Sequence, residues 1–408
     1  MTIRELGAML AFTLAIAACA VALLPSVTET ATAQPTRAPK AAISPTPPHP
    51  PDVQFDASRL PSLQAAELPA CAQPGDLEVG DLSLAFVSDW DADGEVYAVR
   101  ADGSGLAQVT DNTTKEALPR WSPDGQQLAY LDDLFQRSRL VISDADGSNA
   151  SVVAPDLVAT WEVVWSPTGR QVVFRSGPFQ GGDLFALDVQ TSEAVNLTRG
   201  AAPAHGRPSF SPEGDRIVFA AEMPDSAGPP HYRLFTVRAD GTGLTELSFP
   251  SGDVDYWPKW HPSRDEILFQ GLVPGQGVGL YVATLDGSVA KLKAKPRYLV
   301  SYPSWSPDGS MFAYVALDLQ NEVEFHVATE SEDVDRIVLD SEIAGDEYWG
   351  INRYFWAPDS RHVAFFGSGE AYRSNAIYVM DICGGQPQLV VEEVDPDSEV
   401  SWRPLPGR

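Results

Sequence analysis

Carboxylates, aromatic rings and a histidine recur in short segments that precede regularly spaced aromatic residues. Side chains of these types suit recognition of a peptide or a sugar, because the rings stack on flat apolar groups while the carboxylates accept hydrogen bonds. The alternative interpretation is that the rings pack between large loops. Arg207 and Arg353 share these segments. The candidate binding residues are Glu116, Trp161, Glu162, His205, Asp255, Tyr256, Trp257, Tyr302, Tyr348 and Trp349.

A second candidate site is a run of alternating carboxylates just before Gly94. Asp89, Asp91 and Asp93 have the spacing found in calcium-binding loops. The position of the last ligand in a helix-loop-helix calcium loop holds Arg100 instead of glutamate. The same residues also suit a hairpin between two strands, since Asp-Gly is common turn chemistry. Calcium is therefore a candidate cofactor, and a hairpin without metal is the competing interpretation.

No catalytic signature stands out in the sequence. The 6 histidines do not pair at metal-ligand spacing, and no Gly-x-Ser-x-Gly nucleophile turn occurs. We therefore predict a binding role without catalytic residues. The alternative is an enzyme such as a metal-dependent polysaccharide lyase or hydrolase. Its candidate residues are Glu116, Glu162, His205 and Asp255.

The elements that position these residues belong to an internal repeat. An aromatic residue with proline two positions later occurs at Trp121, Trp165, Phe210, Trp260, Trp305, Trp356 and Trp402, at spacings of 44, 45, 50, 45, 51 and 46 residues. Seven residues after each of the first six begins a short apolar strand, followed by a second apolar strand and a turn that is often Asp-Gly. A fourth short strand, as in Val195-Asn196-Leu197-Thr198, closes the unit, so each unit has four antiparallel strands. Such a unit cannot bury both faces alone, so neighbouring units must stack.

The two ends of the repeat indicate how the stack closes. The first unit has apolar strands around Leu84 and Val96 but no aromatic strand, and Trp402 belongs to an aromatic strand with no unit after it. Together the two half-units make one. We therefore predict an all-β fold, a β-propeller of seven four-stranded blades, closed by the C-terminal strand that completes the first blade.

The repeat resembles the TolB-like, WD-repeat-like propeller repeat over roughly residues 80–408. The matching features are the Trp121-Ser122-Pro123-Asp124-Gly125 turn, the two apolar strands after it and the Asp-Gly turn. TolB itself has six blades and an α/β domain in front, and residues 34–80 are too few for such a domain. The TolB role of bridging envelope proteins is therefore not carried over. The repeat also occurs in peptidase propellers and in pectate-degrading lyases.

The N-terminal residues indicate export. Residues 7–24 carry no charge, and three interpretations of residues 1–33 stay open. The segment is a signal peptide cleaved after Ala33, a lipoprotein signal with Cys19 as the lipidated residue, or a retained membrane anchor. Residues 34–75 are a Pro-rich flexible linker and lead-in segment, and residues 76–408 form the propeller.

Two cysteines besides Cys19 are candidates for a disulfide. Cys71 precedes the first strand and Cys383 lies in the last full blade, and ring closure makes these regions neighbours. In an oxidising compartment the two thiols are expected to bond, and two free thiols are the alternative.

Charge limits the choice of partners. Lys plus Arg total 28 and Asp plus Glu total 56, which gives a formal net charge of −28. Such a chain repels nucleic acid, and we expect membrane contact only through the N-terminal segment. The sequence therefore predicts a monomeric, periplasmic or extracellular scaffold. Its acidic, aromatic-rich channel face would bind a protein or glycan ligand of the cell envelope.

Overall fold

The computed structural model divides the chain into two units, residues 1–46 and 47–408, and every residue it describes lies in the second. The described residues are 68–71, 78–90, 93–133, 138–177, 182–202, 204–223, 231–247, 255–273, 277–292, 299–317, 323–330, 335–339, 354–367, 375–384, 386–395 and 398–405. The predicted signal segment, Cys19 and the Pro-rich linker lie outside them. Within these ranges, we find no helix with the length and apolar character needed to span a membrane.

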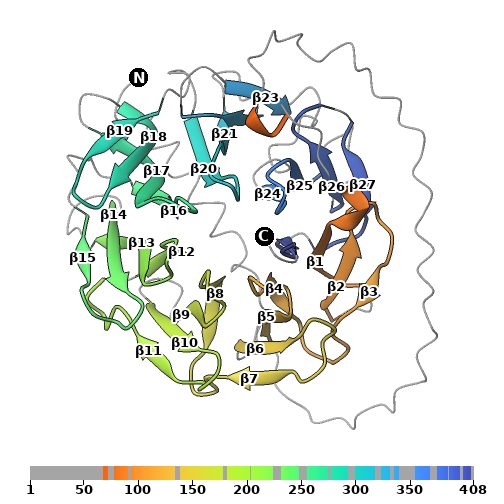
Figure 1. Ribbon diagram of the computed structural model, residues 1–408. Coiled ribbons are helices and arrows are strands. Elements are labelled where there is room, and N and C mark those ends of the chain that lie inside the picture. The colour runs from red at the N-terminus through yellow and green to blue at the C-terminus, as the bar shows by residue number, and fades with distance from the viewer. Residues whose placement is uncertain are drawn as a thin grey trace, which may run out of the picture. The chain divides into compact units, whose positions relative to one another are not determined.

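The described residues form seven four-stranded antiparallel sheets arranged as blades of a ring (Figure 1). Blade 1 contains β1 (Ser83–Ser88), β2 (Glu95–Arg100), β3 (Ala107–Gln108) and β28 (Ser401–Trp402). Blade 2 contains β4 (Ala117–Trp121), β5 (Gln127–Asp132), β6 (Arg139–Asp144) and β7 (Ser151–Val153). Blade 3 contains β8 (Ala159–Trp165), β9 (Gln171–Ser176), β10 (Asp183–Asp188) and β11 (Ala194–Asn196). Blade 4 contains β12 (Ala204–Phe210), β13 (Arg216–Met223), β14 (His231–Arg238) and β15 (Thr245–Glu246).

The remaining blades follow the same order. Blade 5 contains β16 (Asp255–Trp260), β17 (Glu266–Val273), β18 (Gly277–Thr284) and β19 (Val289–Lys291). Blade 6 contains β20 (Leu299–Trp305), β21 (Phe312–Leu317), β22 (Val323–Ala328) and β23 (Asp335–Leu339). Blade 7 contains β24 (Tyr354–Trp356), β25 (His362–Phe366), β26 (Ile377–Asp381) and β27 (Gln388–Val391). Two short 3-10 helices, η2 (Pro69–Cys71) and η3 (Val79–Asp81), precede the first strand. The predicted seven-bladed, all-β propeller is confirmed.

The ring closes as the repeat predicted. Strand β28 pairs antiparallel with β1, with Leu84 opposite Trp402 and Ala85 opposite Ser401. Blade 1 therefore takes its innermost strand from the C-terminal end of the chain and its other strands from the first unit. This pairing joins the two ends of the repeat in one sheet and so holds the first and last units together.

The aromatic-Ser-Pro-Asp-Gly turn is built from buried hydroxyl groups. The Ser122 hydroxyl donates to Asp124 Oδ1 over 2.6 Å and accepts the backbone N–H of Gln127 over 2.9 Å. Gly125 closes the turn with a φ of 65°, where an L side chain would be strained. In blade 5, His261 replaces the serine, and its Nδ1 accepts the backbone N–H of Ser263 over 3.1 Å.

Some repeat tryptophans join neighbouring innermost strands. Trp165 Nε1 donates to the Arg120 carbonyl oxygen over 2.9 Å, and Trp305 Nε1 donates to the Lys259 carbonyl oxygen over 3.3 Å. In each case the acceptor is the residue just before the aromatic of the preceding blade, and the indole satisfies its donor while its rings pack between blades. Other repeat tryptophans bury the indole nitrogen without a hydrogen-bond partner among the described residues: Trp121, Trp260 and Trp356.

A bulge in the innermost strands decides which side chains are presented at the ring axis. Five innermost strands lose register with their neighbour near the third residue before the repeat aromatic. That residue has left-handed backbone although it is not glycine, a conformation that costs about 1–3 kcal/mol. These positions are Leu118 (φ 52°), Glu162 (φ 68°), Arg207 (φ 59°), Trp257 (φ 51°) and Tyr302 (φ 53°).

The lead-in segment is fastened to the ring. Cys71 and Cys383 form a disulfide that spans 312 residues, the pairing expected from the sequence. Leu68 is 1% exposed and packs in the core shared by blades 6 and 7, beside Met311 and Val363. In the chain-entropy model, a cross-link over so long a loop contributes about 5 kcal/mol to the free energy of unfolding.

Candidate functional site

Three bulge residues from successive blades contact one another near the ring axis. The Trp257 and Tyr302 rings stack with centroids 4.3 Å apart. The Arg207 guanidinium carbon lies 5.6 Å from the centroid of each ring. Strands β12, β16 and β20 thus assemble a cation–aromatic group. We call this group and Lys259 the axis cluster; its members are Arg207, Trp257, Lys259 and Tyr302. Each member is neither fully buried nor fully exposed.

Lys259 adds a second cation to the axis cluster. Burial lowers the pKa of its amino group, and the positive charge of Arg207 lowers that pKa further. Glu162 and Glu399 act in the opposite direction, and Arg120 acts with Arg207. These charges come from blades 1 to 4, so Lys259 feels groups from across the ring. Its amino group makes no hydrogen bond or ion pair with any residue that the structure describes.

The other charges near the axis differ in how they are paired. Arg120 forms an ion pair with Glu399. Arg175 is 3% exposed, and burial lowers its pKa while the charge of Glu162 opposes that shift. Among the described residues, the Arg207 guanidinium has no carboxylate within ion-pair distance. Within the part of the chain that the structure describes, Arg207 and Lys259 are therefore two cations without an ion pair, and Glu162 acts on Lys259 through its charge alone.

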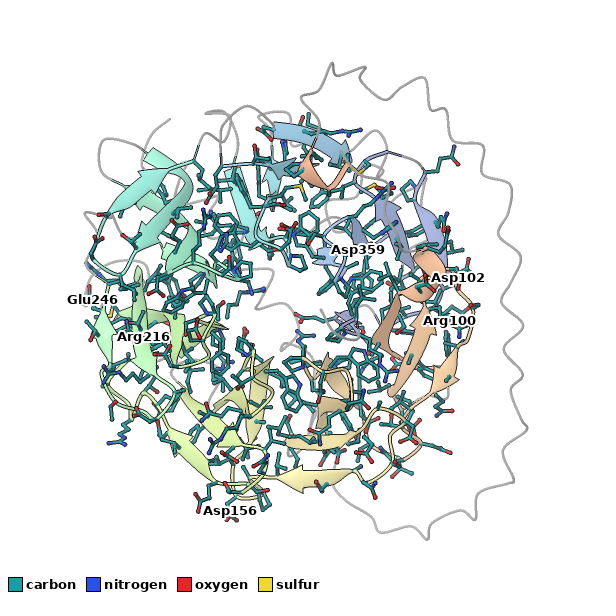
Figure 2. The ribbon with its side chains drawn as sticks, in the orientation of Figure 1. Arg100, Asp102, Asp156, Arg216, Glu246 and Asp359 are labelled. Atoms are coloured by element: carbon teal, nitrogen blue, oxygen red, sulfur yellow. A yellow bond between two sulfur atoms is a disulfide. The ribbon has the colours of Figure 1, made fainter. Side chains whose placement is uncertain are left out.

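Acidic side chains lie both on the outer rim of the ring and nearer its centre, where Figure 2 labels Asp359. The acidic residues labelled in Figure 2 include Asp102, Asp156 and Glu246, which lie on the outer rim of the ring. Glu116, placed on the binding face by the sequence, is fully buried between blades 1 and 2. It is thus not exposed to a ligand at the axis.

Glu116 belongs to an internal group of carboxylates, which we call the acid cluster, with Glu95 and Asp132. Burial, together with a hydrogen bond to Glu95 and the charges of Glu95 and Asp132, raises the pKa of Glu116 to about 9, although the hydrogen bond from Asn112 opposes the shift. Asn112 Nδ2 donates to Glu116 Oε1 over 2.7 Å, and the Asn112 backbone N–H donates to Glu95 Oε1 over 2.7 Å. Arg139 forms an ion pair with Asp132. The segment before β4 thus folds onto blade 1, and the Glu116 carboxyl group forms its hydrogen bonds inside the fold.

The alternating carboxylates form the hairpin between β1 and β2, where Ser88 pairs with Glu95. Asp89 lies 3.6 Å from Lys115 Nζ, and the same amino group pairs with Asp395. Within the described residues, no group of three or more metal-ligating side chains is placed to hold an ion. Asp91 lies outside the described residues, so the predicted calcium site of Asp89, Asp91 and Asp93 stays a prediction.

The structure describes the other predicted residues to different extents. Trp161, His205, Asp255 and Tyr256 are placed on β8, β12 and β16 by their backbone. Tyr348, Trp349 and Arg353 lie outside the described residues. Lys259 was not singled out from the sequence, although it stands just before a repeat aromatic, where three blades carry serine.

Comparisons with known proteins agree with the architecture. Residues 80–264 match the family model described as TolB beta propeller domain. An uncharacterized protein of Agrobacterium fabrum is 27% identical over 143 residues, which are 33% of this chain and 46% of that protein. The chain thus spans less than half the length of this curated relative.

Two solved structures share the fold. One is an oligogalacturonate lyase in complex with manganese, with a TM-score of 0.57 and 15% identity over 76% of this chain and 84% of that one. The other is an acylaminoacyl peptidase of Pyrococcus horikoshii, with a TM-score of 0.55 and 13% identity over 76% of this chain and 51% of that one. At these identities, the likeness concerns the fold alone.

Proposed function

We propose, from the premise that this chain carries a TolB-like β-propeller, that it is an exported, non-catalytic module that binds a protein partner at the ring axis. The observation that carries the proposal is the contact of Arg207, Trp257 and Tyr302 from three successive blades. The backbone bulge repeats, but its side chains differ in chemistry from blade to blade. A repeated scaffold thus presents a non-repeated surface.

The residue types favour a protein as the ligand. Trp, Tyr and Arg are the side chains most enriched among the residues that dominate binding energy at protein interfaces. They stand on hydrogen-bonded strands of a closed ring, so little ordering entropy is lost when a partner docks. A strained backbone at each of these positions agrees with a functional use of the bulge.

Export is supported by two independent features. The uncharged residues 7–24 and the Pro-rich segment after them suit a targeting signal and a spacer. The Cys71–Cys383 disulfide suits an oxidising compartment. We therefore place the module outside the cytoplasm, in the periplasm or beyond, with any membrane contact made by the N-terminal segment.

A second candidate function is an enzyme, such as a polysaccharide lyase. Lys259 favours it, because an amine with a lowered pKa beside an arginine is suited to accept a proton. Turnover of oligogalacturonate by the purified chain, abolished in Lys259→Met, would establish this function in place of the first.

The binding proposal is tested by photo-crosslinking in cells that produce the full chain. A benzophenone amino acid replaces Tyr302 in one variant and Asp156, exposed on the outer rim, in the control. We expect a discrete protein adduct from position 302 that position 156 does not form. Absence of any adduct at 302, or identical adducts at both positions, would overturn the proposal.

A further inference from the structure

We infer that the partner presents an acidic peptide segment, one carboxylate of which is held between Arg207 and Lys259. This inference rests on the proposed function and specifies the ligand for the same site. It starts from two cations without a described anionic partner, close to one another in a chain of net charge −28.

The neighbouring carboxylates stabilise the charge of Lys259 only in part. Glu399 forms an ion pair with Arg120, and Glu162 also acts on the buried Arg175. The charges of Glu162 and Glu399 oppose the effect of burial on Lys259, but the pKa of its amino group stays lowered. A carboxylate supplied by a partner would offset the rest of this effect and separate the like charges of Arg207 and Lys259.

The aromatic pair fixes the geometry of the arginine. A guanidinium close to two rings keeps its five N–H donors, which match the two oxygens of a carboxylate. Trp257 and Tyr302 then offer apolar surface to the residues that flank the acid. This combination favours a peptide strand with an acidic residue beside apolar ones over a free inorganic anion.

Binding should be linked to proton uptake. The charged groups that act on Lys259 are Arg207 on β12, Glu162 on β8, Arg120 on β4 and Glu399 before β28, while Trp257 and Tyr302 lie beside Arg207. A bound carboxylate stabilises the ammonium form and so raises the lowered pKa. Affinity should therefore fall as pH rises through the pKa of the free protein, and complex formation near that pH should take up protons.

An unbiased selection tests the ligand class. A phage-displayed random heptapeptide library is panned on the full chain, on the double variant Arg207→Gln, Lys259→Met and on Trp257→Ala. We expect peptides rich in Asp and Glu from the wild type and loss of that enrichment with the double variant. Calorimetry on the best selected peptide should show a loss of affinity of about tenfold or more in the double variant. The same peptide with its Glu replaced by Gln should bind the wild-type chain with a similar loss of affinity.

The outcomes separate the two proposals. Neutral or basic peptides that still require Trp257 would overturn the acidic ligand and leave the binding site in place. Peptides that bind Trp257→Ala as well as the wild type would overturn the binding site itself. Binding of trigalacturonate without enrichment of any acidic peptide would replace the peptide with an acidic glycan. Thermal unfolding of each variant shows whether it is folded, and Arg207→Lys, which keeps the charge, should retain part of the affinity.

Discussion

The acid cluster and the axis cluster differ in whether their charged groups have partners inside the fold. Glu95 and Glu116 are fully buried, share hydrogen bonds with Asn112, and reduce their repulsion because Glu116 holds a proton. Arg207 and Lys259 are partly buried and have no described carboxylate partner. Buried charge that is satisfied internally serves the fold, whereas charge left unsatisfied at a surface is available to a partner.

The largest effect is expected from breaking the acid cluster. Asn112→Ala removes the donor to Glu116 Oε1 and the acceptor for the Thr114 backbone N–H, which is 2.7 Å away. We predict a loss of about 2–3 kcal/mol in the free energy of unfolding, because buried carboxylates lose a hydrogen bond. Urea unfolding at neutral pH measures it. An unchanged midpoint would show that the cluster is not structural.

Glu116→Gln sharpens the comparison through pH. Since the pKa of Glu116 rises from 4.5 to about 9 on folding, the folded protein binds a proton that the unfolded chain releases between those values. Stability of the wild type therefore falls as pH rises through that window. The glutamine amide can donate to Glu95 at every pH. The free energy of unfolding of the variant should therefore exceed that of the wild type by an amount that grows with pH, roughly 1–2 kcal/mol at pH 8.

The variant must be compared with the wild type because the titration of His326 also lowers the stability of the protein as pH rises. Burial opposes its charge, but hydrogen bonds to Asp335 and Glu324 raise its pKa overall. Its stabilising contribution is full below pH 6.5 and is lost as pH rises through the folded-state pKa. Melting temperatures from pH 5 to pH 9 separate the two residues, since only the Glu116 contribution disappears in Glu116→Gln. Parallel curves for variant and wild type would contradict the raised pKa.

The smallest effect is expected at the axis. Lys259→Met replaces a partly buried cation, which has no ion pair with the described residues, with an apolar side chain of similar length. We predict a change between zero and about 1 kcal/mol of added stability, together with loss of binding to selected acidic peptides. Denaturant titration and calorimetry on the same variant measure both quantities. A destabilisation as large as that of Asn112→Ala would mean that Lys259 has a structural role.

The fold could be predicted from the sequence because its determinants are local and repeated. The turn after Trp121, the apolar strand seven residues later and the half-units at Leu84 and Trp402 each specify a part of one blade. Closure then brought Cys71 to Cys383. Seven copies of one pattern left little freedom in the topology.

The site was predicted less completely for physical reasons. Trp257, Tyr302 and the segment of Arg207 were recognised from residue type, but Lys259 matters only because its amino group has no ion-pair partner among the described residues, which no sequence pattern reveals. Glu116 was expected on the binding face, yet Asn112 and Thr110 hydrogen bonds fold its segment inward. Which way a loop turns depends on such contacts, and strand periodicity carries no information about them.

The pKa of Lys259 tests the central claim most directly. NMR of the lysine side-chain amines, assigned with Lys259→Met, would follow its titration in the full chain, free and with a selected acidic peptide. We predict a pKa below the ordinary value of 10.5 in the free protein and a clear rise on binding. The claim would be contradicted if the pKa of Lys259 in the free protein had the ordinary value and did not change when the peptide binds. Lys259 would then not bind a carboxylate of the peptide.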